Sequence, residues 1–339
     1  MNLLAVQNTS RSYNGAGQTS ATTQQGTSLQ SKTDIEITAL RDVNVQSSNI
    51  NAEQDINIAA ANNILVTSEQ ETSNSKRNYR NTYNNNMTQS GSEIIAGGNT
   101  SLFAQQNIGI EGSLIDSKDK TSLRADKNVV LSSAEEFRTS GYSYKKRSGF
   151  MGHRKKSIKH SEEYLTHQAA TLSGDNGVEI VSGANTQIVA SDVISAKGNI
   201  NIATGGELQQ LAQLDKTRIQ HSKKKSSAWG LVKKDHSLDK VNHSANGSIS
   251  EAMGNVALRS GGSTRLQASE IKAASVSITA GVDTQGNLVN PNAKIYLDSI
   301  TEFSSLRESI FDSSGLKFVS IDKGFEKTQQ AQTTIDTQT

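Results

Sequence analysis

The sequence has 339 residues, enough for two globular domains, but only 33% are hydrophobic and 4% aromatic, which is low for conventional packed cores. The absence of cysteine excludes disulfides and thiolate metal sites. The net charge of +2 is close to neutral, but it conceals a strong segregation of charge along the chain.

The first regular feature along the chain is a 21-residue repeat of short apolar-x-apolar pairs. Each pair follows a turn residue, as in DVNV at 42 and DINI at 55. Alternation over three residues places two side chains on one face of a strand. The preceding Asn, Asp or Gly tolerates the left-handed backbone that a sharp corner demands. The repeating residues are Ile35, Ile37, Val43 and Val45 and, one interval later, Ile56, Ile58, Ile64 and Val66.

A larger period joins two such coils into one unit. The segments SNINAEQDINIAAANNILVTSEQE, SLIDSKDKTSLRADKNVVLSSAEE and DVISAKGNINIATGGELQQLAQLD align without gaps, at steps of 65 and 79 residues. Coils stacked about 4.8 Å apart would pair each strand with its copy and line the interior with Ile, Leu and Val. Apolar residues two apart and many β-branched residues argue against an α-solenoid. The pattern therefore predicts a β-solenoid.

The units are separated by excursions of varied length. Glu71, Glu136 and Asp215 recur once per unit, where each excursion begins. The fourth unit contains an inserted loop at 281–292 with the single proline. In chain order we expect a partial excursion at 1–33, coil units at 34–71, 94–136, 174–215 and 251–303, excursions at 72–93, 137–173 and 216–250, and the start of a further excursion at 304–339.

Two of the excursions share a basic motif with apolar residues at its centre. KKRSGFMGHRKK at 145–156 and KKKSSAWGLVKK at 223–234 lie 78 residues apart. Residues 137–167 and 216–241 each hold eight Lys or Arg against two acids, so each carries +6 while the rest of the chain sums to −10. The sequence therefore predicts basic, aromatic-tipped projections on an acidic rod.

Such projections are candidate surface- or membrane-binding elements. Aromatic bodies enter a headgroup region while Lys and Arg meet anionic lipid or lipopolysaccharide phosphate, each basic residue contributing on the order of 1 kcal/mol. The candidate residues are Lys145, Lys146, Arg147, Phe150, Met151, Arg154, Lys155, Lys156, Lys223, Lys224, Lys225, Trp229, Lys233 and Lys234.

Double-coil units followed by excursions such as KKRSGFMGHRKKSIKH and KKKSSAWGLVKKDHS resemble the haemagglutinin repeats of filamentous haemagglutinins and of contact-dependent growth inhibition toxin carriers. SSGLKFVSIDKG at 313–324 looks like a third, divergent version of the same turn. The resemblance covers nearly the whole chain. It implies an all-β fold, a right-handed parallel β-helix (β-solenoid) with extruded β-hairpin-like excursions between double-coil units.

The resemblance also implies a function and a location. It implies a segment of a large adhesin or toxin carrier, secreted across the outer membrane of a Gram-negative bacterium by a two-partner system and displayed at the cell surface. The implied partners are the outer-membrane transporter of that system, acting on an N-terminal region that this sequence lacks, and the target-cell envelope or lipopolysaccharide. No pretoxin motif or toxin domain is recognisable in the sequence.

Alternative functions stay open beside this prediction of a non-enzymatic structural and interaction segment. Phe150, Met151 and Trp229 could instead pack the excursions against the rod, which would leave a passive spacer. A polysaccharide-acting β-helix enzyme needs carboxylates gathered in one groove, whereas the coil acids are scattered. With no phosphate loop, nucleophile motif or nucleic-acid module recognisable, we expect no cofactor, no small-molecule substrate and no nucleic-acid partner.

The six histidines all lie in excursions. The first three are seven residues apart, an odd interval that alternates faces of a strand, so we expect no metal site. Because histidine titrates near pH 6.5, acidification should add positive charge to the excursions. These residues are His153, His160, His167, His221, His236 and His243.

Overall fold

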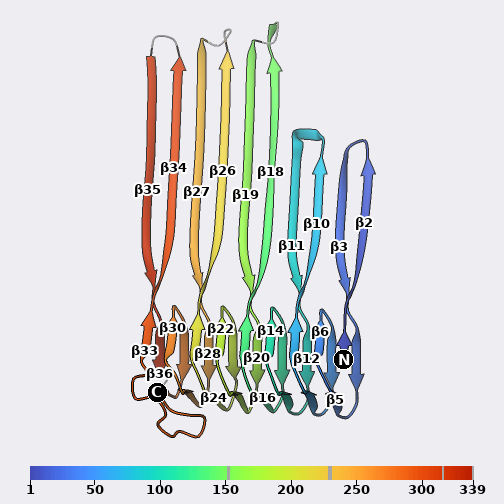
Figure 1. The fold of residues 1–339 in the computed structure, drawn as a ribbon. Helices are drawn as coiled ribbons and strands as arrows, with labels where there is room; N and C mark the ends of the chain where they lie inside the picture. The colour runs from blue at the N-terminus through green and yellow to red at the C-terminus, as the bar shows by residue number, and fades with distance from the viewer. Residues whose placement is uncertain (151–152, 228–230, 315–316, 338–339) are drawn as a thin grey trace.

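The computed structural model describes residues 1–150, 153–227, 231–314 and 317–337. Figure 1 shows a rod of stacked β-coils from which long β-hairpins extend to one side. The predicted parallel β-helix with hairpins between double-coil units is confirmed. Within the described residues, no helix has the length and apolar character needed to cross a membrane.

Each coil contributes one short strand to each of three parallel sheets. The chain passes through the first, second and third coil sheets in turn and then begins the next coil. The register pairs equivalent residues of successive coils, for example Ile35 with Ile56, Val43 with Ile64 and Leu102 with Leu123. The 21-residue period of the sequence is therefore one turn of the helix.

The strands of the coil sheets have the following bounds in the described residues. The first coil sheet contains β4 (Ser28–Ser31), β7 (Asn49–Ala52), β12 (Glu93–Ala96), β15 (Leu114–Ser117), β20 (Thr171–Gly174), β23 (Asp192–Ser195), β28 (Ile249–Ala252), β31 (Glu270–Ala273) and β36 (Thr334–Thr337). The second contains β5 (Ile35–Ala39), β8 (Ile56–Ala60), β13 (Thr100–Ala104), β16 (Lys120–Ala125), β21 (Gly177–Ser182), β24 (Asn199–Thr204), β29 (Asn255–Ser260) and β32 (Ser275–Ala280). The third contains β1 (Asn2–Leu3), β6 (Val43–Gln46), β9 (Ile64–Thr67), β14 (Ile108–Glu111), β17 (Val129–Ser132), β22 (Thr186–Val189), β25 (Leu208–Leu211), β30 (Thr264–Gln267) and β33 (Ile295–Asp298).

The interior of the rod is a set of aliphatic ladders. Along the coil strands buried and more exposed residues alternate, so only the inward half of the residues needs to be apolar. Ile56, Leu102 and Leu123 are examples of fully buried ladder members. Each such side chain contributes about 1.5–3 kcal/mol through burial. A coil needs only these few residues, which explains the low overall hydrophobicity.

The Asn and Asp corners behave differently from the sequence prediction. They do not adopt the left-handed conformation: the described non-glycine residues with positive φ lie elsewhere. Instead, their side chains bridge successive coils. Asn63 Nδ2 donates to Asp42 Oδ1 over 3.0 Å, and Asn107 Nδ2 donates to Asn63 Oδ1 over 2.9 Å. A side-chain amide both donates and accepts, so it can continue this ladder from coil to coil.

Four left-handed residues of the coils occupy the corner between the third and first coil sheets. Ser47, Ala190 and Ala268 have φ near 45° there (42°, 45° and 45°), and Gly112 has φ 52°. At Gly112 a Cβ atom would lie only 2.7 Å from Cβ of Ala134 and 2.9 Å from Oγ of Ser68, so glycine is required. These tight corners occur in one coil of each unit, and a hairpin leaves from the same corner in the other coil.

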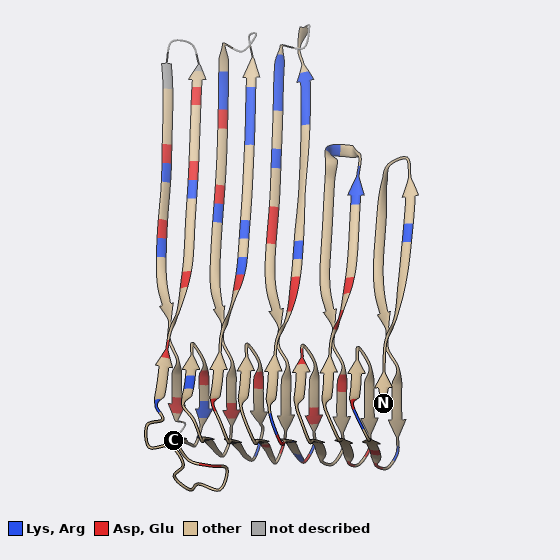
Figure 2. Cartoon of the chain, in the orientation of Figure 1, with Lys and Arg blue, Asp and Glu red and all other residues tan. Residues whose placement is uncertain are grey.

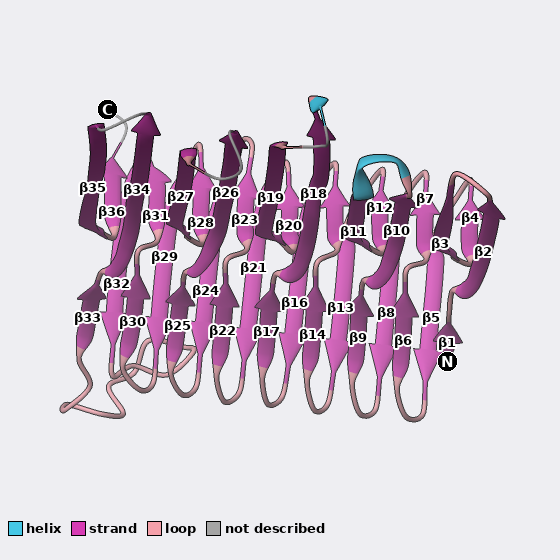
Figure 3. Ribbon diagram, turned by 90° about the horizontal axis from the view of Figure 1, so that it is seen from above, coloured by secondary structure: helices cyan, strands magenta, loops and turns pink. Residues whose placement is uncertain are grey.

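The hairpins pair with one another as well as within themselves. Strand β3 pairs with β10, β11 with β18, β19 with β26 and β27 with β34, all antiparallel. The result is one continuous hairpin sheet beside the rod, and Figure 3 shows its hairpins following the coils in chain order. Its elements are β2 (Val6–Asn14), β3 (Gly17–Gln25), β10 (Glu69–Arg77), the 3₁₀ turn η1 (Tyr79–Asn81), β11 (Thr82–Ser90), β18 (Ala134–Ser148), β19 (Arg154–Gln168), β26 (Gln213–Ser227), β27 (Val232–Asn246), β34 (Ile300–Ser314) and β35 (Lys317–Ala331).

Both ends of the chain differ from the expected division. Residues 1–33 are more than a partial excursion, since they form strand β1, a whole hairpin and strand β4. Residues 304–339 are more than the start of one: β34 begins at Ile300, inside the expected fourth coil unit, and β36 returns to the first coil sheet. Each hairpin continues directly from a coil strand without a linker, so composition does not mark these boundaries.

Carboxylates fasten the root of each hairpin to the preceding one. Glu71 Oε1 accepts a hydrogen bond from the backbone N–H of Gln24 over 2.8 Å. Glu136 Oε1 accepts one from Gln89 over 3.1 Å, and Glu302 Oε1 accepts one from Ala245 over 2.8 Å. In the fourth hairpin, Asp215 Oδ1 lies 2.7 Å from His167 Nδ1 instead. The acids that recur in the sequence are therefore the contacts that join neighbouring hairpins.

Candidate functional site

The three C-terminal hairpins extend farther from the rod than the first two. Their strands have 15 residues, against 9 in the first two hairpins. Figure 2 shows Lys and Arg gathered near the far ends of β18, β19, β26 and β27. The sequence-predicted basic residues of two excursions thus come together on four neighbouring strands.

Four lysines form a single row across these strands, here called the lysine row. Lys146 is directly opposite Lys156, Lys156 is opposite Lys225, and Lys225 is opposite Lys234. Residues directly opposite one another project from the same face of a sheet, and neighbouring strands lie about 4.8 Å apart. Like charges in this position repel one another. The lysine row is therefore a surface that a bound anion would stabilise.

Few carboxylates neutralise the row. At its end, Lys234 Nζ lies 2.7 Å from Asp312 Oδ2. The ion pairs of the described residues include none with Lys146, Lys156 or Lys225. Three of the four ammonium groups thus retain charge that an external anion can neutralise.

A hollow of about 510 Å³ adjoins the lysine row on the same face. The row itself supplies one side of the hollow, and Arg154 is a further cation in its lining. Ser148 and Ser227 also line it and contribute hydroxyl groups. The hollow thus combines concentrated positive charge with neutral hydrogen-bonding groups.

Tyr144 and Arg80 belong to this region, although the sequence did not predict their part in it. The guanidinium of Arg80, in the 3₁₀ turn of the second hairpin, lies 5.4 Å from the Tyr144 ring centroid. Lys156 Nζ lies 5.6 Å from the same ring. The hydrogen bond of Lys156, helped by the charges of Arg80 and Lys146, lowers the pKa of the Tyr144 hydroxyl. The contact joins residues 64 positions apart, as their numbers show, so only the paired hairpins reveal it.

The remaining predicted site residues divide between the two faces. Strand alternation places five of them on the face opposite the lysine row: Lys145, Arg147, Lys155, Lys224 and Lys233. Of these, Lys155 also lines the hollow. Lys223 shares the face of the row. Phe150 is 82% exposed, so it does not pack its hairpin against the rod. Met151 and Trp229 lie outside the described residues.

A row of aromatic rings lies closer to the rod on the face of the lysine row. Tyr142 lies 5.4 Å from His160, His160 5.7 Å from His221, and His221 6.3 Å from His236, measured between ring centroids. Burial is the main cause that lowers the pKa of His221. The charges of His160, His236 and Lys223 lower this pKa further. In the part of the chain that the structure describes, no three His, Asp or Glu side chains are placed to hold a metal ion.

Glutamates accompany two of these histidines. His160 Nε2 lies 3.0 Å from Glu162 Oε1, and His236 Nε2 lies 2.7 Å from Glu308 Oε1. His160 and His236 thus each have an acidic partner, whereas His221 lies between these two histidines and near Lys223. Protonation of His221 adds charge where positive charge is already concentrated.

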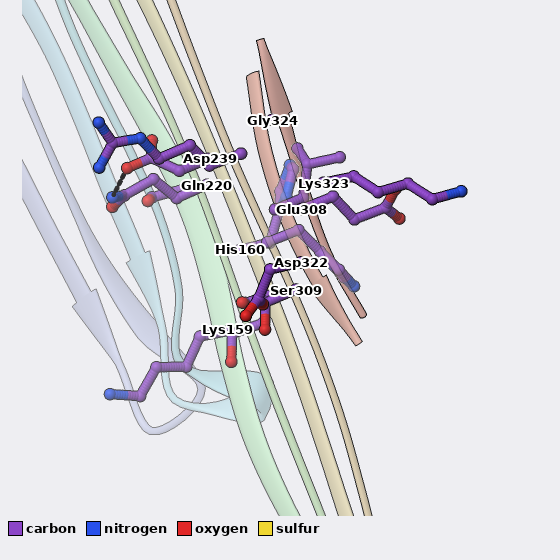
Figure 4. Close-up of a pocket in the computed structure, with 15 residues that line it drawn as sticks. Lys159, His160, Gln220, Asp239, Glu308, Ser309, Asp322, Lys323 and Gly324 are labelled. Carbon is purple, nitrogen blue, oxygen red and sulfur yellow. Dashed lines mark hydrogen bonds between the residues drawn. The ribbon is translucent and has the colours of Figure 1, made fainter. Parts of the chain in front are cut away.

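A second hollow, of about 680 Å³, crosses the hairpin sheet nearer its middle (Figure 4). It is lined by small or polar residues such as Ser222, Ser237 and Gly324. Its carboxylate Asp239 accepts hydrogen bonds from Arg218 Nη2 over 3.0 Å and from Gln220 Nε2 over 3.3 Å. The Arg218 contact lowers the pKa of Asp239. A carboxylate that an arginine keeps charged is one member of a structural ion pair. It does not hold the proton that a general acid must donate.

Taken together, the coils and hairpins define a class of protein: a parallel β-helix whose double coils alternate with paired β-hairpins. The family model of the hemagglutinin repeat matches residues 6–82 and 75–228. The chain belongs to the hemagglutinin repeat family and is a structural segment of a haemagglutinin-like protein. This family consists typically of non-enzymatic structural or adhesive segments of secreted or surface exoproteins. Neither a curated protein nor a solved structure gave a match.

Proposed function

We propose that this chain is an interaction segment of a large secreted adhesin or toxin carrier, in which the rod provides reach and the basic end of the hairpin sheet engages the envelope of a target cell. The lysine row is the observation that supports this proposal most strongly. In the proposal the parent protein leaves a Gram-negative bacterium through the outer-membrane transporter of a two-partner secretion system, and lipopolysaccharide is its envelope partner.

The energetics favour attachment by many weak contacts. Each exposed lysine near an anionic surface contributes on the order of 1 kcal/mol. The hairpin sheet holds the four lysines of the row on adjacent strands, three of them exposed and Lys156 partly exposed, so little conformational freedom of the backbone is lost on binding. Several rods on one filament would engage together, which raises the overall affinity without any new contact.

Co-sedimentation of the purified chain with vesicles tests the proposal. We expect binding to vesicles that contain lipopolysaccharide, little binding to neutral vesicles, and loss of binding as salt is raised from about 0.1 M to 1 M, where the screening length falls from about 10 Å to about 3 Å. Absence of binding to both kinds of vesicle at low salt would instead favour a passive spacer.

The tip residues provide a second prediction. Replacing Phe150, Met151 and Trp229 by Ser should leave the β signal in circular dichroism unchanged, because Phe150 is exposed and stabilises no described core. Binding to lipopolysaccharide vesicles should weaken at least about fivefold, since apolar tip surface would no longer enter the headgroup region. A variant that loses its β signal would show that these residues are needed for folding.

A further inference from the structure

We infer that the lysine row and its adjoining hollow form one composite site for a saccharide that bears at least two phosphate groups. The inference rests on the proposed function, because both use the same end of the hairpin sheet. It goes further by naming the ligand class and by assigning binding to one face of the sheet rather than to the hairpin tips.

The site is composite because two hairpins build it. Lys146 and Lys156 belong to the third hairpin, whereas Lys225 and Lys234 belong to the fourth. The pairing of β19 with β26 brings the two halves together in register, with Lys156 opposite Lys225. The row crosses three strand spacings, about 14 Å. A ligand with a single anionic group would occupy only part of that length.

The chemistry of the lining favours phosphate on a saccharide. An ammonium group is a compact point charge with three donors and serves widely as a phosphate ligand. Ser148 and Ser227 can donate to, or accept from, sugar hydroxyls. The volume of about 510 Å³ lies within the roughly 300–1,000 Å³ typical of small-ligand sites. Tyr144, whose ring lies near Arg80 and Lys156, adds an aromatic ring beside the row.

The position of the row favours a ligand that lies against the sheet. Lys146 and Lys225 precede the ends of their strands at Ser148 and Ser227. Their side chains project from the flat face, together with Lys156 and Lys234 from the neighbouring strands. A saccharide chain can lie along this face, whereas a bilayer would first meet the hairpin tips.

The structure offers a matched pair of variants for the test. The ladder variant carries Lys146→Gln, Lys156→Gln, Lys225→Gln and Lys234→Gln. The control variant carries Lys145→Gln, Arg147→Gln, Lys224→Gln and Lys233→Gln, which removes the same charge from the opposite face of three of these strands, at residues outside the lining of the hollow. Titration of the full chain with glucose 1,6-bisphosphate, inorganic polyphosphate, inorganic phosphate and glucose, followed by NMR or calorimetry, measures binding.

We expect the wild-type chain to bind the bisphosphorylated sugar more tightly than inorganic phosphate or glucose. The ladder variant should lose at least about tenfold in affinity, because the charges of the lysine row that face the phosphates are removed. The control variant should lose less than about threefold, as expected for long-range charge alone. Polyphosphate that binds more tightly than the sugar would show that the saccharide is not part of the ligand and overturn the inference.

Other outcomes separate this inference from the proposed function. Equal losses in the two variants would mean diffuse attraction and overturn the single-face site, while vesicle binding could still stand. If the variant with Ser at positions 150, 151 and 229 loses vesicle binding but keeps its affinity for the sugar, the result supports a site on the face of the sheet. A wild-type chain that binds the bisphosphorylated sugar but not lipopolysaccharide vesicles would contradict the proposed function and leave the site intact.

Thermal melting checks folding: the ladder variant should melt no earlier than wild type, because repulsion between lysines is relieved.

Discussion

Buried serines line the corner between the third and first coil sheets and satisfy backbone groups there. The N–H of Ser48 donates to Ser92 Oγ over 3.1 Å, and the N–H of Ser92 donates to Ser113 Oγ over 3.1 Å. The Ser92 hydroxyl in turn donates to the carbonyl oxygen of Thr67 over 2.8 Å. A small hydroxyl fits this crowded corner and supplies both a donor and an acceptor.

Ser92→Ala should destabilise the rod by about 1–3 kcal/mol, because the buried N–H of Ser48 loses its acceptor. Urea unfolding followed by circular dichroism measures the change. Ser122→Ala, on the outward side of β16, is the control and should change stability by less than about 0.5 kcal/mol. Equal effects in the two variants would argue against a role for the serine ladder.

At the residue scale, the sequence predicted the aliphatic ladders because their period is regular and short. It did not predict which corner takes the left-handed backbone, since Ser47, Ala190 and Ala268 are not residues that favour it. Stacking fixes the corner geometry coil by coil and overrides this local preference. The lysine row could not be predicted either, because a shift of one residue in register would move Lys156 to the other face.

At the element scale, the root carboxylates determine how one hairpin meets the next. Glu136→Ala should release the amide of Gln89, whose hydrogen exchange should speed up about fivefold, equivalent to about 1 kcal/mol. Glu136→Gln retains a carbonyl oxygen that can accept the same hydrogen bond, so it should largely restore protection. Unchanged exchange in the alanine variant would show that β11 and β18 hold together without this contact.

The neighbouring histidines His160, His221 and His236 make the stability of the hairpin sheet sensitive to acid. The pKa of His221 is lowered in the folded chain, so the unfolded chain, with a pKa near 6.5, takes up a proton more readily. The contribution of neutral His221 to stability is fully present above about pH 6.5 and declines as the pH falls below that value. Protonated His160 and His236 increase the repulsion, whereas Glu162 and Glu308 reduce it.

His221→Gln should therefore weaken the decline of thermal stability between about pH 6.5 and pH 5. Melting temperatures of both proteins across this range provide the measurement. Lys223→Gln removes one of the charges that lower the pKa of His221 and should give a smaller change in the same direction. Identical pH profiles for wild type and His221→Gln would exclude this histidine as the cause.

The hairpins themselves were predictable, but their pairing with one another was not. Interruptions of the coil pattern and turn residues predict an excursion of hairpin type. Pairing between β19 and β26 depends on how far the rod advances between residues 168 and 213, which a local pattern does not contain. The convergence of two basic segments on one face was therefore beyond the reach of the sequence.

At the scale of the whole molecule, the double-coil unit has a geometric reason. Two coils advance the rod by about 9.6 Å, twice the strand spacing. A hairpin consists of two strands and occupies the same width. Hairpins inserted at every second coil therefore pair edge to edge without strain, whereas hairpins at every coil would not fit and hairpins at every third coil would leave a gap.

Insertion of one extra coil tests this explanation. A duplicate of residues 93–113 placed after Ser113 gives three coils between the second and third hairpins, so β11 and β18 should separate while the rod stays folded. We expect amide exchange to rise from Tyr83 to Met87, the segment that pairs with β18, without loss of protection in the coil strands. Insertion of two coils is the control for length. Protection of β11 that persists with one extra coil would contradict the geometric explanation.

The strands of all four sheets lie across the rod, so their backbone hydrogen bonds run along its axis and oppose stretching. The hairpin sheet adds to this resistance unequally. The junction between β19 and β26 is paired from Lys155 to Leu165, whereas that between β11 and β18 is paired only from Tyr83 to Met87. The junction between β27 and β34 is paired over an equal length, from Lys233 to His243. A filament under tension would therefore yield first near its shorter hairpins, and the three longer hairpins would separate last.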